Sequence, residues 1–505
     1  MAQGNLLLSH WHLTTVSFFT TDTIFFAFFL KFLPFSPGTV HNVNGFIFAL
    51  VVMLASWLAA RRSGNHKLDL LGATATFAVV AFPSQSFGPC TLLGPIHMGT
   101  MLWIVLAMIL FDVSDNSAVP KSEDSQKVRE FALSWLPLAA ALFCLTMALI
   151  GDALTLYVAI LPIGFVSFVW LRQGRSQRGR EMKVLGVCVG AIVCTKIFAF
   201  VLRFLNGFQL PAGGVSNPEF VPFDRFGENI RFSLEGLLNV YNANFFGVPI
   251  GEAALQIMGF CGLGTIFYCL YRATRALRSQ PQDGGGTVAP ALDRVSAVLC
   301  FGMLLNLICY ASSTVVLGVM TVRYFVPFFI YGAILVGRLG VPIWRAGDPL
   351  IRREWLFIFS IGAFAWFYVF AARAIRVPLP PPSPEAQLSR WLQDRNLTQG
   401  YGTYWSSTVL MVESRGRVQV SQVILRDGKI APYLWGSDDR WYRKPARFVV
   451  MESPDYAGVN EKTVVETFGP PAERHRVLQF TILVWNRDIA PRLLMTEIEQ
   501  KVRAR

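Results

Sequence analysis

Charge is scarce in this 505-residue chain. Asp, Glu, Lys and Arg together make up 15% of it, whereas 53% of the residues are hydrophobic and 42 are Phe. A soluble protein does not need so large an apolar share to build its core. The composition therefore excludes an ordinary soluble protein and predicts a chain whose main solvent is lipid. In such a chain a net charge of +13 is explained by basic residues on the cytoplasmic side, next to the anionic inner leaflet of the membrane. We therefore expect no nucleic-acid partner.

Cysteine is absent from the long loop 206–249 and from everything beyond residue 376. All eight Cys lie in or beside apolar segments, at positions 90, 144, 188, 194, 261, 269, 300 and 309. This distribution excludes a disulfide framework and a cysteine zinc site. Residues 1–22 also lack the basic start and the clean apolar core of a signal peptide.

Long hydrophobic runs, in contrast, recur along the chain. We expect about ten membrane spans, near 40–60, 68–83, 97–112, 131–150, 153–171, 184–205, 250–271, 295–318, 324–341 and 354–373. Alternate connectors hold nearly all the Lys and Arg, while the opposite connectors hold only Arg225, Arg231 and Arg323, with Lys31 before the first span. The basic connectors should be cytoplasmic. The loop after 205 and everything beyond 376 should lie outside.

These assignments divide the chain into four regions. An outer loop with an interfacial helix occupies 1–39, the bundle 40–373, a Pro-rich linker 374–384, and a soluble extracytoplasmic domain 385–505. The predicted fold is an α-helical polytopic membrane bundle with interfacial helices and a small C-terminal α/β or α+β domain.

Two segments are typical of helices that lie on a membrane surface. The first is Thr23–Leu33, which is short for a span and is followed by Pro34. The second runs from about Phe226 to Tyr241, with an apolar stripe of Ile230, Leu234, Leu237 and Leu238. Both should lie on the outer surface.

The C-terminal region predicts one helix and four strands. The helix is Glu385–Asp394, and the strands are Thr408–Val412, Val418–Leu425, Arg447–Met451 and Val477–Trp485. Its loops are rich in aromatic residues, namely Tyr401, Tyr404, Trp405, Trp435, Trp441 and Tyr442. Two interpretations remain open: a platform that stacks on sugar rings, or a packed aromatic core, which we favour.

An ionisable side chain inside a membrane costs free energy, so such residues are the first candidates for a functional site. Asp22, surrounded in sequence by Phe, is a candidate general base, and the alternative is an N-cap of the helix that follows. Asp152 follows Gly151 in a tight outer turn, as a second carboxylate or as a turn residue.

Basic candidates suit a substrate that bears a phosphate. Lys196 and Arg203 lie seven residues apart on one helical segment, about 10 Å along its axis, and we expect Lys196 to face the bundle interior. The alternative for both is snorkelling or pairing with a carboxylate. Arg323, followed by Tyr324, stands at an outer helix end, as a phosphate fork or an interfacial anchor. His97 begins a span on the same side, as a site residue or a helix-start hydrogen bond.

Several short motifs together carry a resemblance. They are Gly4-Asn-Leu-Leu-Leu followed by Trp11, Ser17-Phe-Phe-Thr-Thr-Asp22, Gly94-Pro-Ile-His97, Gly151-Asp152 and Arg323-Tyr-Phe-Val-Pro327. With the many spans, the acidic outer loop and the C-terminal outer domain, the chain resembles the GT-C superfamily of integral-membrane glycosyltransferases. The resemblance covers most of 1–373.

The resemblance implies an enzyme of a bacterial inner membrane that serves the cell envelope. Its donor would be a sugar on polyprenyl phosphate, and its acceptor a hydroxyl of a lipid, glycan or protein, with inversion. Asp22 would be the base, Arg323 with Lys196 and Arg203 the phosphate clamp, and His97 and Asp152 groups that line the cavity.

Two further expectations concern the start of the chain and a metal. Members of the superfamily begin with a cytoplasmic N-terminus and a first span, whereas Met1 here falls inside the acidic loop, so we expect an upstream start or a truncated, inactive form. No cofactor is expected; the alternative is a divalent metal, which we do not favour because the outer carboxylates are scattered, at Asp22, Asp152, Glu219, Asp224 and Glu252.

Two rival functions stay open beside the enzyme. A transporter or flippase would show internal repeats or broken helices, and no convincing repeat is present in the sequence. A ligase or polymerase of lipid-linked glycans would concentrate Arg in one outer loop, but the 206–249 loop has only Arg225 and Arg231.

Overall fold

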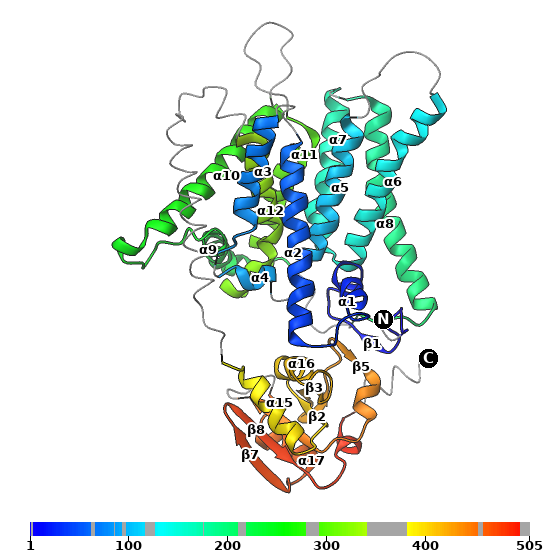
Figure 1. The fold of residues 1–505 in the computed structure, drawn as a ribbon, viewed down its shortest axis with the longest axis vertical. Helices are drawn as coiled ribbons and strands as arrows, with labels where there is room; N and C mark the ends of the chain where they lie inside the picture. The colour runs from blue at the N-terminus through cyan, green and yellow to red at the C-terminus, as the bar shows by residue number, and fades with distance from the viewer. Residues whose placement is uncertain are drawn as a thin grey trace.

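The structure of the protein is a computed structural model. It describes residues 1, 4–61, 66–84, 86–92, 97–116, 127–174, 176–210, 219–278, 292–340, 381–452 and 458–494. A helical bundle forms one end of the molecule and a domain with a β-sheet the other, with the helices along the long axis (Figure 1).

The bundle is built mainly from long apolar helices. They are α2 (Pro37–Ala60), α3 (His66–Val80), α5 (Met98–Asn116), α6 (Lys127–Gly151), α7 (Leu161–Gln173), α8 (Arg178–Phe204), α10 (Ala254–Arg278), α11 (Arg294–Ala311) and α12 (Val326–Leu335). The short helices α1 (Ile24–Phe29) and α4 (Gly88–Leu92) lie between them in the chain. Short turns η2 (Leu156–Ile160), η4 (Val319–Phe325) and η5 (Val336–Gly340) extend α7 and α12.

Seven helices among the described residues are long and apolar enough to cross a membrane. They are Pro37–Ala60, Met98–Asp115, Leu156–Gln173, Arg178–Phe204, Ala254–Arg275, Arg294–Ala311 and Thr321–Gly340. Two other predicted spans correspond to the shorter apolar helices Leu68–Val80 and Trp135–Gly151, and the tenth, 354–373, lies outside the described residues. A membrane protein follows, while the count of ten stays a prediction.

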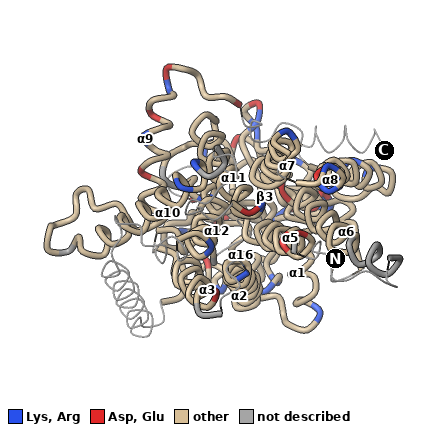
Figure 2. Tube along the Cα trace, turned by 90° about the horizontal axis from the view of Figure 1, so that it is seen from above, with Lys and Arg blue, Asp and Glu red and all other residues tan. Residues whose placement is uncertain are grey.

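The loop between α8 and α10 contains the predicted amphipathic helix, α9 (Phe223–Val240), and a short turn, η3 (Ile250–Glu252). Figure 1 shows α9 nearly end-on, across the direction of α2 and α5, and Figure 2 shows charged residues along it. Ile230 and Leu234 of the predicted stripe are exposed, whereas Leu237 is buried, as are Asn229 and Ser233. One face of α9 therefore packs on the bundle, and a second apolar face is left for lipid.

The C-terminal domain is a six-stranded sheet of order β4-β3-β2-β6-β8-β7, in which β2 runs parallel to β3 and β6. The strands are β2 (Gln399–Gly402), β3 (Gln419–Arg426), β4 (Lys429–Pro432), β6 (Phe448–Glu452), β7 (Glu473–Val477) and β8 (Phe480–Val484). Helices α15 (Pro384–Asp394), α16 (Tyr404–Glu413) and α17 (Glu461–Phe468) complete it, with the short turns η6 (Asp439–Arg443) and η7 (Ala490–Arg492).

One predicted strand of this domain is wrong. The segment Thr408–Val412 belongs to α16, which buries Leu410 and exposes Val409. Its β-branched residues favour a strand locally, but β2 and β3 are parallel and neighbouring, and such a pair needs a crossover helix between its strands. The predicted helix 385–394 and the strands near β3, β6 and β8 are confirmed.

The N-terminal segment of the bundle contacts the C-terminal domain. Its strand β1 (Trp11–His12) pairs antiparallel with β5 (Ser437–Asp438) of the C-terminal domain. The rings of Trp11 and Trp441 lie 5.1 Å apart, and Asp439 approaches the side chain of His10 at 3.4 Å. The N-terminal segment and the C-terminal domain thus lie at the same end of the bundle.

Candidate functional site

The segment before α1 is fastened to the end of α6 and to α5. It forms a π-helical turn, η1 (Phe19–Thr23), which follows Phe18 in a left-handed conformation, with φ of 47°. The Ser17 hydroxyl donates to the carbonyl oxygen of Ile150 at 2.8 Å, and the Trp103 indole donates to that of Thr20 at 3.1 Å. These bonds fix the turn that contains Asp22 against two helix ends.

Two glycines allow this close approach. A Cβ at Gly99, on α5, would lie 2.8 Å from Oδ2 of Asp22, and one at Gly151, at the end of α6, would lie 2.8 Å from the Thr21 hydroxyl. Real Cβ contacts are not that short, so any larger residue would push the turn away. Both glycines belong to short motifs of the sequence, Gly94–Thr100 and Gly151-Asp152, and packing explains them.

Asp22 is 2% exposed, and the Thr21 hydroxyl donates to its Oδ2 at 2.6 Å. It does not cap α1, whose N-cap is Thr23 without a side-chain hydrogen bond, so the capping alternative is wrong. Burial raises the pKa of Asp22 to about 7; the Thr21 hydrogen bond opposes this shift and the charge of Asp152 adds to it. Among the described residues no cation forms an ion pair with Asp22.

His97 and Asp152 form a buried pair beside it. His97 Nδ1 lies 2.6 Å from Asp152 Oδ2, and Asp152 also accepts from the Thr100 hydroxyl and the Leu154 amide, both at 2.9 Å. Burial alone would raise the pKa of Asp152, but the nearby His97 and these hydrogen bonds hold it below the ordinary value. An ionised carboxylate only accepts, so Nδ1 carries the hydrogen.

His97 is held in an unusual conformation by aromatic neighbours. Its φ is +62°, which non-glycine residues seldom adopt and which is common at functional sites. The ring lies 6.0 Å from that of Phe18 and 5.1 Å from that of Tyr324. The Arg323 guanidinium lies 5.3 Å from the Tyr324 ring. The structure therefore brings Asp22, His97, Asp152 and Tyr324 together, with Arg323 at the edge.

Lys196 and Arg203 are not part of this cluster. Both are exposed on α8, along the side that also exposes Val189, Ile197, Phe200 and Phe204. The expectation that Lys196 faces the bundle interior is wrong. The sequence spacing places the two residues on one face but does not determine which face packs, and the packed face of α8 holds small or aliphatic residues such as Val187 and Ala191.

The aromatic residues of the C-terminal domain divide into two groups. Tyr401 and Tyr442 are buried in its core, as the packing interpretation predicted. Tyr404, Trp405 and Trp435 form a separate ring cluster with Tyr433, in which Trp405 is 57% exposed. Trp441 contacts Trp11 of the N-terminal segment.

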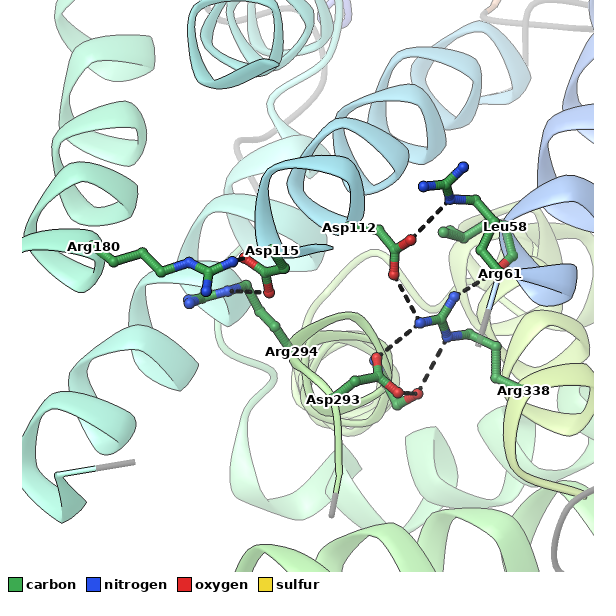
Figure 3. A network of polar contacts seen from close by, with 9 residues as sticks. Leu58, Arg61, Asp112, Asp115, Arg180, Asp293, Arg294 and Arg338 are labelled. Atoms are coloured by element: carbon green, nitrogen blue, oxygen red, sulfur yellow. Dashed lines mark hydrogen bonds and ion pairs between the residues drawn. The ribbon is translucent and has the colours of Figure 1, made fainter. Parts of the chain in front are cut away.

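A second charged cluster lies at the opposite end of the bundle (Figure 3). Its centre is Arg338, which is 1% exposed and contacts Asp112 and Asp293 at 3.0 Å each. The same guanidinium donates to the Leu58 carbonyl at 2.6 Å, and Arg61 bonds the other oxygen of Asp112 at 2.8 Å. These contacts join the ends of α2, α5, α11 and η5.

The neighbouring half of this cluster is centred on Arg294. It contacts Glu181 at 2.5 and 2.7 Å, Asp115 at 3.1 Å and the Ser167 hydroxyl at 2.8 Å, and Arg180 bonds the second oxygen of Asp115. Four guanidinium groups thus meet four carboxylates at the ends of these helices.

Sequence reasoning missed these pairings. It assigned Arg61, Arg180, Arg294 and Arg338 to connectors and used them only for orientation. Asp112 and Asp115 at the end of an apolar segment were the available signal, because ionisable groups there need partners. Thr21, Gly99 and Thr100 were also missed, although Thr21 lies within a quoted motif and the other two lie two and three residues after His97.

The chain matches no protein-family model, no curated protein and no solved structure. The chemistry of the site therefore has to be argued from its own residues. Among the described residues no group of three or more His, Cys, Asp and Glu side chains has the arrangement of a metal site. What remains is a carboxylate with a raised pKa, a His–Asp pair and an arginine.

Proposed function

We propose that this chain is a membrane glycosyltransferase. It transfers a sugar from a polyprenyl phosphate carrier to a hydroxyl of a lipid, glycan or protein on the outer face of the membrane, with inversion. The observation that carries the proposal is that Asp22, buried with a pKa near 7, lies in one cluster with His97 and Tyr324, whose ring the Arg323 guanidinium approaches at 5.3 Å.

Asp22 suits the role of general base. A base works best when its pKa is close to the working pH, and an ordinary aspartate is too weak. Burial of Asp22 without an ion-pair partner among the described residues supplies that shift. The acceptor hydroxyl loses its proton to Asp22 while its oxygen attacks the anomeric carbon.

Arg323 suits the departing phosphate. Its planar fork of donors fits phosphate oxygens, and no acid among the described residues pairs with it in a salt bridge. A cation on one side of the sugar and a base on the other favour direct displacement, which inverts the anomeric carbon. Lys196 and Arg203 have no role in this scheme, because both are exposed on α8 and lie outside the Asp22 cluster.

The side of the membrane is inferred from charge. The Arg-rich helix ends lie at the end of the bundle opposite to the C-terminal domain and to Asp22 (Figure 1). Basic helix ends are typical of the cytoplasmic side. This distribution supports an extracytoplasmic Asp22 and C-terminal domain, and the membrane we propose is a bacterial inner membrane.

The test is transfer of a radiolabelled sugar from polyprenyl phosphate donors in membrane vesicles. Asp22→Asn should lower the rate about 10²- to 10⁴-fold, the usual share of a general base. Asp394→Asn is the matched control, because Asp394 is exposed at the end of α15 in the C-terminal domain.

Transfer by the wild type that survives in Asp22→Asn would remove Asp22 from the mechanism. Absence of transfer, together with movement of the labelled lipid between leaflets, would favour the transporter or flippase. Joining of whole glycans would favour the ligase.

A further inference from the structure

We infer that His97, oriented by Asp152, is a second phosphate-binding group and donates a hydrogen bond to the departing polyprenyl phosphate. This inference rests on the proposed function and assigns part of its donor site. It gives His97 a catalytic role and Asp152 a positioning role.

The first argument is the number of cations left near Asp22. The phosphate clamp suggested by the sequence had three members, but Lys196 and Arg203 are exposed on the outer side of α8. Only Arg323 remains of that set. Loss of a sugar converts a phosphate diester into a monoester that gains negative charge, so a single cation leaves this charge incompletely compensated.

The second argument is the position of His97. Its ring lies between Phe18, next to the Asp22 turn, and Tyr324, next to Arg323. The imidazole therefore contacts a neighbour of the proposed base and a neighbour of the proposed phosphate-binding arginine. No other described histidine contacts residues of this cluster; His10 and His12, for example, approach Asp439 of the C-terminal domain.

The third argument is the orientation of the ring. Nδ1 is directed at Asp152 at 2.6 Å, and Asp152 is itself fixed by Thr100 and the Leu154 amide. Nε2 is consequently the nitrogen left for a ligand. An imidazolium carries a hydrogen on each nitrogen, so it would donate to the carboxylate through Nδ1 and to the phosphate through Nε2.

The transfer forms one bond to the anomeric carbon and breaks another. The acceptor oxygen forms a bond to the anomeric carbon, and its proton goes to Asp22. The bond between the anomeric carbon and the phosphate oxygen breaks, and its electron pair stays on that oxygen. His97 keeps its proton and stabilises the new charge through the hydrogen bond, and Asp22 releases its proton to water afterwards.

A binding experiment tests this assignment without requiring turnover. Polyprenyl phosphate and uncharged polyprenol are titrated into the full chain in nanodiscs, for the wild type, His97→Asn, His97→Gln and Asp152→Asn. Asn retains a donor near Nδ1 for Asp152 but has nothing at Nε2, whereas Gln places a neutral donor near Nε2. His41→Asn is the matched control, because His41 is exposed on α2.

His97→Asn should weaken polyprenyl phosphate binding about 10- to 100-fold, the usual worth of a hydrogen bond to a charged group, and leave polyprenol binding unchanged. His97→Gln should lose less, and Asp152→Asn should fall between them. Equal phosphate binding by His97→Asn and the wild type would overturn the inference. Parallel loss of both ligands would overturn it too, because the role would then be structural.

A second donor separates this result from the proposed function. A glycosyl fluoride of the same sugar has no phosphate, so His97→Asn should transfer from it about as fast as the wild type, while Asp22→Asn remains slow. An equal loss with both donors would contradict the phosphate role. Phosphate binding that depends on His97 in a protein without transfer would refute the proposed function and keep only the phosphate-binding role of His97.

Discussion

Helix α5 links two charged clusters of opposite character. At its start, His97, Gly99 and Thr100 contact Asp22 and Asp152; at its end, Asp112 and Asp115 contact four arginines. Fifteen residues separate His97 from Asp112, which is about 22 Å along a helix. The second cluster pairs each carboxylate with a guanidinium, whereas the first leaves Asp22 without such a partner among the described residues.

The difference separates stability from chemistry. Ionisable groups in a bundle are costly, and pairing removes most of that cost. In a fully paired cluster the charged groups already bond one another, so few of them can bind a substrate. A buried carboxylate without a cation has a raised pKa and can exchange a proton, so the Asp22 cluster is where we expect chemistry.

The largest expected effect comes from breaking the paired cluster. Arg338→Met should lower the free energy of unfolding by about 3 to 5 kcal/mol, because it removes the buried guanidinium that bonds both Asp112 and Asp293. Arg61→Met removes a bond to the same Asp112 from a more exposed position, 26% against 1%, and should cost clearly less. Thermal unfolding in nanodiscs checks this, and equal losses would mean that Asp112 is not held mainly by Arg338.

In the Asp22 cluster, removal of the charge should raise the free energy of unfolding instead of lowering it. The folded pKa of Asp22 is raised, so the folded state binds the proton more tightly than the unfolded chain and loses stability as pH rises from about 4 to 7. Asp22→Asn should therefore stabilise the protein above pH 7, by about 4 kcal/mol at most, and change little at pH 4. Unfolding of both proteins across this pH range measures the effect. A destabilised Asp22→Asn at pH 8 would contradict it.

The same titration predicts the pH dependence of transfer. Asp22 must be ionised to accept a proton, so the rate should rise as pH increases through about 7. The rate of sugar transfer between pH 5 and 9 checks this. A rate that is flat across pH 7 while chemistry limits turnover would exclude Asp22 as the base.

The next expected effect concerns the close approach of Gly99, at the start of α5, to the turn that contains Asp22. Gly99→Ala places a methyl group against Asp22 and the Thr21 carbonyl, and should lower transfer about 10²-fold through displacement of the turn. Gly186→Ala is the control, because a Cβ at this position of α8 meets nothing within 4 Å. Equal activity of the two variants would show that the turn tolerates the shift.

The smallest effect concerns the contact with the C-terminal domain. Although partial burial opposes the shift, His10, His12 and Arg443 hold the pKa of Asp439 below its ordinary value. This contact stabilises the protein above the unfolded pKa and is lost as pH falls through the folded one. Asp439→Asn should weaken docking of β1 by about 1 kcal/mol, seen as faster hydrogen exchange at residues 11–13. Unchanged exchange would mean that Trp11 and the strand pairing suffice.

The sequence predicted the general plan well because that plan depends on composition. Seven of the expected spans, the amphipathic helix α9 and most C-terminal elements follow from apolar runs, periodicity and proline. The strand predicted at 408–412 failed because its local propensity competes with the demand for a crossover between parallel strands.

The candidate site was predictable in part for a similar reason. A carboxylate, a histidine and an arginine at helix ends next to apolar runs are visible in a sequence, and Asp22, His97, Asp152 and Tyr324 do meet. Lys196 shows the limit, because the spacing of α8 places it on a face without telling whether lipid or protein covers that face.

By itself, then, the sequence determined which segments enter the membrane and which of their ends are basic. Hydrophobicity and charge are properties of each residue and do not depend on how the helices pack. Tertiary structure alone decided the partners. His97 bonds Asp152 from 55 positions away and Arg338 bonds Asp112 from 226, contacts that exist only once the helices are packed. The same packing buried Asp22 without a cation among the described residues while it paired Arg338 with two carboxylates, because a charge is stabilised by what surrounds it in space.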